Sequence, residues 1–142
     1  LSSYAATYHH ERGDIAVGNS GVMSLNTATR TEAVEDGLSA TILIGEKAGN
    51  KTDLSWLSGT LATLRAATGI NKGKNNNQFG GQQPVNPEAV EINDGFGSSH
   101  TGGGHFVIGD GAVRFLSQNI DPGVLQSLVN KADGAPLDEG TF

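Results

Sequence analysis

Cysteine is missing from all 142 residues of the sequence, which excludes disulfide bonds, thiolate metal ligands and cysteine nucleophiles. Basic residues are also few: nine Lys and Arg stand against fifteen Asp and Glu, giving a net charge of -6. Without a basic cluster, the chain is not expected to bind nucleic acid or to dock on anionic lipid. The sequence also lacks an apolar run near the roughly 20 residues that a membrane-spanning helix needs.

Large apolar side chains are scarce as well. Aromatic residues make up 6% of the chain and hydrophobic residues 36%, whereas glycine fills 21 positions. A chain of this length can bury roughly two thirds of the surface that it exposes when unfolded. We therefore expect a small hydrophobic core that is stable without disulfide or metal cross-links. We expect a single domain over residues 1–142, with short strands and long loops rich in Gly and Asn. The stretch from Asn71 to Pro87 has little to bury and is predicted to be an exposed loop.

The clearest strand in the sequence covers residues 41–46. It is apolar and β-branched along Thr41-Ile42-Leu43-Ile44, and Gly37 and Gly45 bound that run. Such a run predicts a central strand that is covered on both faces. Residues 1–21 are polar and interrupted by glycine. They predict a loop with one short strand, anchored in the core by Tyr4, Tyr8 and Ile15-Ala16-Val17.

Residues 105–116 consist of two apolar runs separated by Asp110-Gly111. Asp-Gly is typical of a two-residue type I′ hairpin turn, because that turn needs positive φ at both central residues. On this turn, one face of the hairpin carries four apolar side chains in two cross-strand pairs: Ile108 with Val113, and Phe106 with Phe115.

After the hairpin, Asp121-Pro122 places a capping carboxylate directly before a proline at the first helical position. An apolar stripe with helical spacing follows: Val124, Leu125, Leu128 and Val129. We expect a helix over 122–132 that packs on the sheet. The predicted fold class is therefore α+β, with a small antiparallel sheet, a C-terminal hairpin and one packed helix.

One motif makes the sequence recognisable. His100, nine residues and then Asp110-Gly111 resembles the hallmark of the prepilin-associated H-X9-DG family, also called domain of unknown function 1559. The segment from Val34 to Glu46 resembles that family's "DGTSNTLLVGE" pattern, and Val113 to Asp121 is similar to its C-terminal pattern. The family often has Asn where this chain has His105.

The resemblance implies a pilin-like head. Members typically carry a prepilin leader and one hydrophobic N-terminal helix, and no such helix precedes Leu1 in this sequence. We therefore expect the head portion of an extracytoplasmic subunit that contacts the membrane only through that helix. Its implied role is structural, in a pilus-like or type II secretion-associated assembly, with copies of itself or related subunits as partners and without enzymatic activity.

A different class of function stays open. A carbohydrate or surface-polymer binding module would need an exposed aromatic platform, for which Trp56, Tyr4 and Tyr8 are the candidates. If these side chains are buried, the binding-module hypothesis loses its platform; if they are exposed, the hypothesis of a purely structural subunit is weakened.

The polar residues of the family pattern are His100, Asp110 and Glu46, and together they could hold a divalent metal such as calcium. Each also has a plain structural explanation. The turn itself demands Asp110-Gly111, His100 can bond the Gly-rich loop, and Glu46 can cap a strand end. His9-His10-Glu11 is another ligand-type cluster, but neighbouring side chains on a regular element point apart, so we expect an exposed loop there. No other cofactor is expected.

A hydrolase would require a nucleophile, and Ser98 and Ser99 next to His100 invite that reading. Neither serine stands in a G-x-S-x-G elbow, and no acidic residue is identified to orient the histidine. We therefore expect that the chain is not an enzyme.

Overall fold

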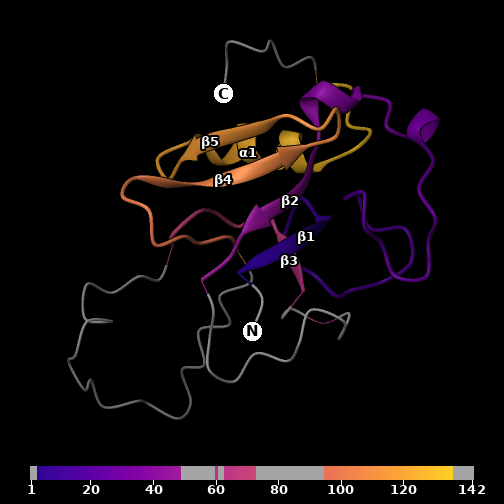
Figure 1. The fold of residues 1–142 in the computed structure, drawn as a ribbon. Coiled ribbons are helices and arrows are strands. Elements are labelled where there is room, and N and C mark those ends of the chain that lie inside the picture. The colour runs from indigo at the N-terminus through magenta and orange to yellow at the C-terminus, as the bar shows by residue number, and fades with distance from the viewer. Residues whose placement is uncertain (1–2, 49–59, 61–62, 73–94, 136–142) are drawn as a thin grey trace.

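The computed structural model describes residues 3–48, 60, 63–72 and 95–135. The described elements are β1 (Tyr4–His9), η1 (Thr31–Ala33), η2 (Leu38–Ala40), β2 (Ile42–Glu46), β3 (Leu64–Ala66), β4 (Gly103–Ile108), β5 (Val113–Ser117) and α1 (Pro122–Val129), where η marks a 3-10 turn. The strands form one sheet in the order β3-β1-β2-β4-β5 (Figure 1). A small sheet with one helix agrees with the expected α+β class.

The sheet is mixed, which corrects the expectation of an antiparallel one. β1 pairs parallel with β3, with Thr7 opposite Arg65, whereas the pairs β1–β2, β2–β4 and β4–β5 are antiparallel. Parallel neighbours require a long crossover connection, and more than fifty residues separate His9 from Leu64. The prediction relied on the Asp110-Gly111 turn, and a tight turn of this kind can predict only the pairing of two antiparallel strands.

β2 lies third of five in the sheet, so its predicted central position is confirmed. Its two faces differ. Ile42 is fully buried beside α1, but Ile44 is only half-buried. The expectation that this strand is covered on both faces is therefore wrong at Ile44. Of the expected N-terminal anchors, Tyr8 is fully buried in β1, whereas the side chains of Tyr4 and Val17 are 55% and 70% exposed.

The turn between β4 and β5 has three residues, Gly109-Asp110-Gly111, and is closed by Ile108 and Ala112, where a two-residue turn was expected. Ile108 donates its N–H to the carbonyl of Ala112 at 2.9 Å and accepts from the N–H of Gly111 at 2.9 Å. Within the turn only Gly111 has a positive φ, +91°. A three-residue loop whose last residue is a left-handed glycine is a common hairpin connection with a bulge.

The extra turn residue shifts the strand register by one. His105 lies opposite Phe115 and Val107 opposite Val113, which corrects the expected pairs of Phe106 with Phe115 and Ile108 with Val113. A shift by one residue moves a side chain to the other face of a sheet. Phe106 and Ile108 accordingly lie in the core, whereas Val113 is 64% and Phe115 48% exposed.

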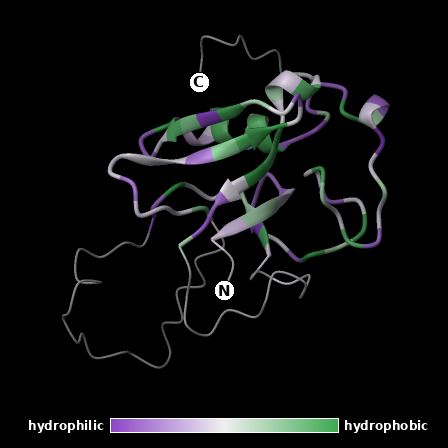
Figure 2. Cartoon of the chain, in the orientation of Figure 1, coloured by the Kyte–Doolittle hydropathy of each residue, from purple (hydrophilic) through white to green (hydrophobic). Residues whose placement is uncertain are grey.

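Helix α1 begins as predicted. The Asp121 side chain accepts hydrogen bonds from the N–H groups of Gly123 and Val124 at 2.8 and 3.2 Å, and Pro122 follows at the first helical position. The helix ends at Val129, three residues before the expected end. Its buried residues Leu125, Leu128 and Val129 pack in one core with Ile42, Ile70, Phe96, Phe106, Ile108 and Leu116. Figure 2 shows hydrophobic (green) colouring on much of β2 and α1, whereas β5 alternates between green and purple.

In the part of the chain that the structure describes, no helix has the length and apolar character that crossing a membrane requires. Of the predicted exposed loop, only Asn71 and Lys72 fall within the described residues. Trp56 lies outside them.

Candidate functional site

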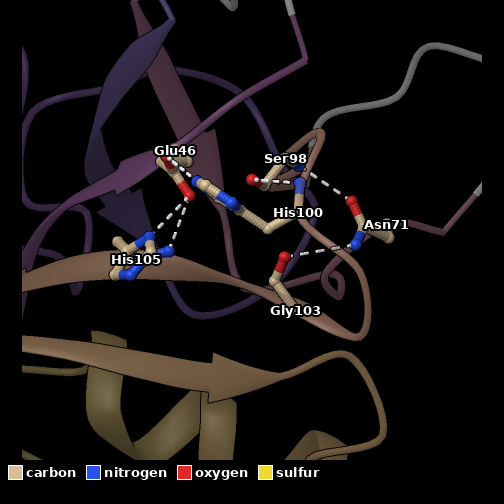
Figure 3. A network of polar contacts seen from close by, with 6 residues as sticks. All are labelled: Glu46, Asn71, Ser98, His100, Gly103 and His105. Carbon is tan, nitrogen blue, oxygen red and sulfur yellow. Dashed lines mark hydrogen bonds and ion pairs between the residues drawn. The ribbon is translucent and has the colours of Figure 1, made fainter.

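Two imidazoles converge on one carboxylate at the C-terminal end of β2. Oε1 of Glu46 lies 3.3 Å from Nε2 of His100, and Oε2 lies 3.4 Å from Nδ1 of His105. The backbone N–H of His105 also donates to Oε2 at 2.7 Å. The two imidazole rings meet edge to face, with centroids 4.8 Å apart (Figure 3). One ligand-type atom from each residue lies within 4.8 Å of the other two.

Three separate elements deliver these side chains. Glu46 ends β2, His105 lies in the neighbouring strand β4, and His100 belongs to the loop that leads into β4. The loop is fastened to β2, because Gly97 donates its N–H to the carbonyl of Glu46 at 2.9 Å. The cluster therefore depends on the β2–β4 pairing and on the path of the loop.

Ser98 and Asn71 hold the loop in place. The Ser98 hydroxyl donates to Glu46, and its oxygen accepts the N–H of His100 at 3.1 Å. Asn71 accepts the N–H of Ser98 at 2.8 Å and donates to the carbonyl of Gly103 at 3.4 Å. Asn71 adopts a left-handed backbone, with φ +57°, which asparagine tolerates better than most residues. The first residue of the predicted exposed loop is therefore a half-buried support for the cluster.

The side chain of Glu46 is 14% exposed, whereas those of His100 and His105 are 54% and 43% exposed. Burial by itself raises the pKa of Glu46. Hydrogen bonds from the His105 backbone and the Ser98 hydroxyl, together with the nearby His100 imidazole, outweigh burial and hold the pKa of this carboxyl below its ordinary value of 4.5. The carboxylate is thus charged at neutral pH, and the cluster opens to solvent on its imidazole side.

Gly104 allows the carboxylate to approach β4. A Cβ at this position would lie 3.3 Å from Oε2 of Glu46 and 3.2 Å from Cβ of Ser98, tighter than ordinary van der Waals contact. A side chain at position 104 would therefore crowd both the Glu46 carboxylate and Ser98.

The structure unites two of the three residues expected to bind metal. Glu46 and His100 meet, but Asp110 lies in the β4–β5 turn and is not part of the cluster. Its Oδ1 accepts the N–H of Ala112 at 2.9 Å, and Gly111 supplies the positive φ that follows it. The motif spacing places β4 between His100 and Asp110, which separates them. His105 takes the third place, and sequence reasoning missed it because the β2–β4 neighbourhood has no local signal.

The adjacent histidines at the end of β1 also differ from expectation. The ring centroids of His9 and His10 are 4.7 Å apart, and both Nδ1 atoms contact the Ser20 hydroxyl, at 3.1 and 2.6 Å. They converge because the chain leaves the strand at His10 and is no longer extended. Burial, as the largest cause, lowers the pKa of His9.

The cluster adjoins a partly exposed apolar surface on the sheet. We define the open sheet face as Tyr4, Ile44, Val107, Val113 and Phe115, whose exposure ranges from half-buried to 64% for Val113. A hollow of about 340 Å³ at this face is lined by four of them together with Glu46, His105 and Phe106. The Phe115 ring packs edge to face on His105, with centroids 5.2 Å apart.

Comparisons with known proteins give one result. Neither a search of curated proteins nor a search of solved structures finds a match. The model of the family described as "Protein of unknown function (DUF1559)" matches residues 1–123, most of the chain. This agrees with the resemblance noted from His100 and Asp110-Gly111, and the chain belongs to the DUF1559 family.

Proposed function

We propose that this chain is a non-enzymatic assembly subunit, the head of a prepilin-like or pseudopilin-like protein in a pilus-like or secretion-associated structure of the cell envelope. The observation that carries the proposal is the open sheet face. Val113 and Phe115 stand on β5, an edge strand, and are 64% and 48% exposed. Exposed apolar side chains gathered on one face are typical of surfaces that another protein covers.

The partner in this proposal is a second copy of the chain or a related subunit of the same family. A surface made of aliphatic and aromatic side chains matches the apolar centre of a protein interface. Between copies with a net charge of -6, long-range repulsion has to be outweighed by such contacts. The subunit would act outside the cytoplasm.

The alternative, a carbohydrate or surface-polymer module, loses part of its platform. Tyr8 is fully buried, and its hydroxyl donates to the carbonyl of Gly13 at 2.7 Å, so it cannot stack on a sugar. Tyr4 is 55% exposed, and Trp56 lies outside the described residues. Assembly is therefore the function that we favour.

These 142 residues hold no cysteine, so a thiol introduced among them tests the proposal, with the unchanged full-length protein as the control for any thiol elsewhere. Val113→Cys and Val17→Cys place it at sites of similar exposure, 64% and 70%, inside and outside the open sheet face. With the native full-length protein in its own cells, a membrane-impermeant thiol-to-amine cross-linker should join Val113→Cys to another family subunit and leave Val17→Cys mostly unlinked. Equal labelling at both positions, without products that contain another family subunit, would overturn the proposal.

A further inference from the structure

We propose that Glu46, His100 and His105 form a binding site for a divalent transition-metal ion of the zinc type, with three protein ligands and an open side toward solvent. This inference is independent of the proposed assembly role. It rests on the positions of three side chains and on the chemistry of their donor atoms.

The separations between donor atoms fit such an ion. Zinc binds imidazole nitrogen and carboxylate oxygen at roughly 2.0–2.2 Å, so neighbouring ligands in a tetrahedral site lie about 3.3–3.5 Å apart. One oxygen of Glu46, Oε1, lies 3.3 Å from Nε2 of His100, and the other, Oε2, lies 3.4 Å from Nδ1 of His105. One ligand atom from each residue lies within 4.8 Å of the others, and small rotations of the two exposed imidazoles close the remaining gap.

The carboxylate is held in the way that metal ligands commonly are. The backbone N–H of His105 and the Ser98 hydroxyl both donate to Glu46, which fixes the orientation of the carboxylate. Ser98 is 5% exposed and is itself held by Asn71. Outer partners of this kind orient metal ligands and raise affinity.

The donor set selects the class of metal. Two imidazoles and one carboxylate suit zinc, copper or nickel, whereas calcium and magnesium prefer sites made of oxygen ligands alone. His100 and His105 are 54% and 43% exposed, which leaves room for water or an outside ligand at the open position. Three protein ligands with one open position resemble reactive zinc sites more than closed structural ones.

The test is a titration of the chelator-treated chain with Zn²⁺ by calorimetry and with Co²⁺ by visible absorption. One equivalent should bind, and the cobalt spectrum should indicate tetrahedral coordination. His100→Ala, His105→Asn and Glu46→Gln should each weaken binding by more than the roughly 10–100-fold typical of an outer-shell partner, and Ser98→Ala should fall within that range. Both histidine variants change exposed side chains, so folding should persist, and circular dichroism checks this.

Two controls separate this site from other ligands. Asp110→Asn changes the motif aspartate outside the cluster, and the His9→Ala/His10→Ala double variant removes the other pair of histidines. Both should bind Zn²⁺ as the unchanged chain does. The proposal is overturned if binding persists in a chain that lacks both His100 and His105, if it disappears with His9 and His10, or if no Zn²⁺ binds. In the last case Glu46 only pairs with the histidines.

Discussion

The backbone N–H of His105 donates a 2.7 Å hydrogen bond to Oε2 of Glu46, across 59 positions of sequence. The bond joins the end of β2 to the start of β4 and aims the carboxylate at both imidazoles. In a regular pair of strands this N–H would donate to a backbone carbonyl, whereas here it donates to the side chain of Glu46. The carboxylate therefore contributes to the sheet as well as to the cluster.

Glu46→Gln should lower the free energy of unfolding by about 2 kcal/mol, since hydrogen bonds to a charged acceptor contribute roughly 1.5–3 kcal/mol. The amide keeps the shape of the side chain but loses the charge, and only its carbonyl oxygen can still accept a hydrogen bond, where the carboxylate had two accepting oxygens. Urea unfolding with a chelator present measures the change. Glu35→Gln, at an exposed position, should change stability by less than about 0.5 kcal/mol. Equal effects of the two substitutions would contradict a structural role for Glu46.

The same carboxylate predicts how stability depends on pH. Because the folded protein holds the pKa of Glu46 below 4.5, the charged form stabilises the fold. That contribution is present above pH 4.5 and is lost as pH falls through the lower folded pKa. In chelator, the stability difference between the unchanged chain and Glu46→Gln should be largest above pH 4.5 and should shrink as the pH falls from there through the lowered pKa of the folded protein. A difference that grows on acidification would reverse the assigned direction.

The sequence predicted those elements whose signals are local. Asp121-Pro122 and the stripe after it gave the start and the buried face of α1, and the apolar run at 41–46 gave the central strand. The hairpin register depended on whether Gly109 belongs to the strand or the turn, a choice that two- and three-residue loops leave open. That single residue moved Val113 and Phe115 to the open sheet face.

The candidate site was half predicted. Glu46 and His100 were identified through the family pattern, but the partners that complete and support the cluster come from distant parts of the chain. His105 reaches Glu46 through the β2–β4 pairing, and Asn71 reaches Ser98 across 27 positions. Long-range pairing of this kind leaves no periodicity or spacing in the sequence, so local patterns alone could not find it.

Two neighbouring glycines should respond very differently to alanine. A Cβ at Gly103 would overlap the backbone oxygen of Leu116, so β4 and β5 would have to separate. At Gly104 the nearest atoms are side-chain atoms of Ser98 and Glu46, at 3.2 and 3.3 Å, which can shift. We expect Gly103→Ala to cost about 3 kcal/mol or more and Gly104→Ala about 1 kcal/mol.

Thermal and urea unfolding of both variants test this difference. Gly104→Ala should also shift the NMR resonance of the His105 amide, because the bond from that amide to Glu46 is displaced. Similar costs for the two variants, with the His105 amide unmoved, would contradict the close approach of Glu46 to β4.

The turn at Asp110 offers a test that distinguishes the observed loop from the two-residue turn that its sequence predicts. In a type I′ turn both central residues have positive φ, so Asp110→Gly would relieve strain and stabilise the protein. In the observed loop only Gly111 has positive φ, and Oδ1 of Asp110 accepts the N–H of Ala112 at 2.9 Å. Asp110→Gly should therefore destabilise the protein by about 1–2 kcal/mol, from the lost hydrogen bond and a more flexible unfolded chain. Gly111→Ala should cost about 1–2 kcal/mol through its left-handed backbone alone, since no atom lies within 4 Å of the added Cβ. Urea unfolding of the two variants decides the matter, and a stabilising Asp110→Gly would restore the two-residue turn and, with it, the register that buries Val113 and Phe115.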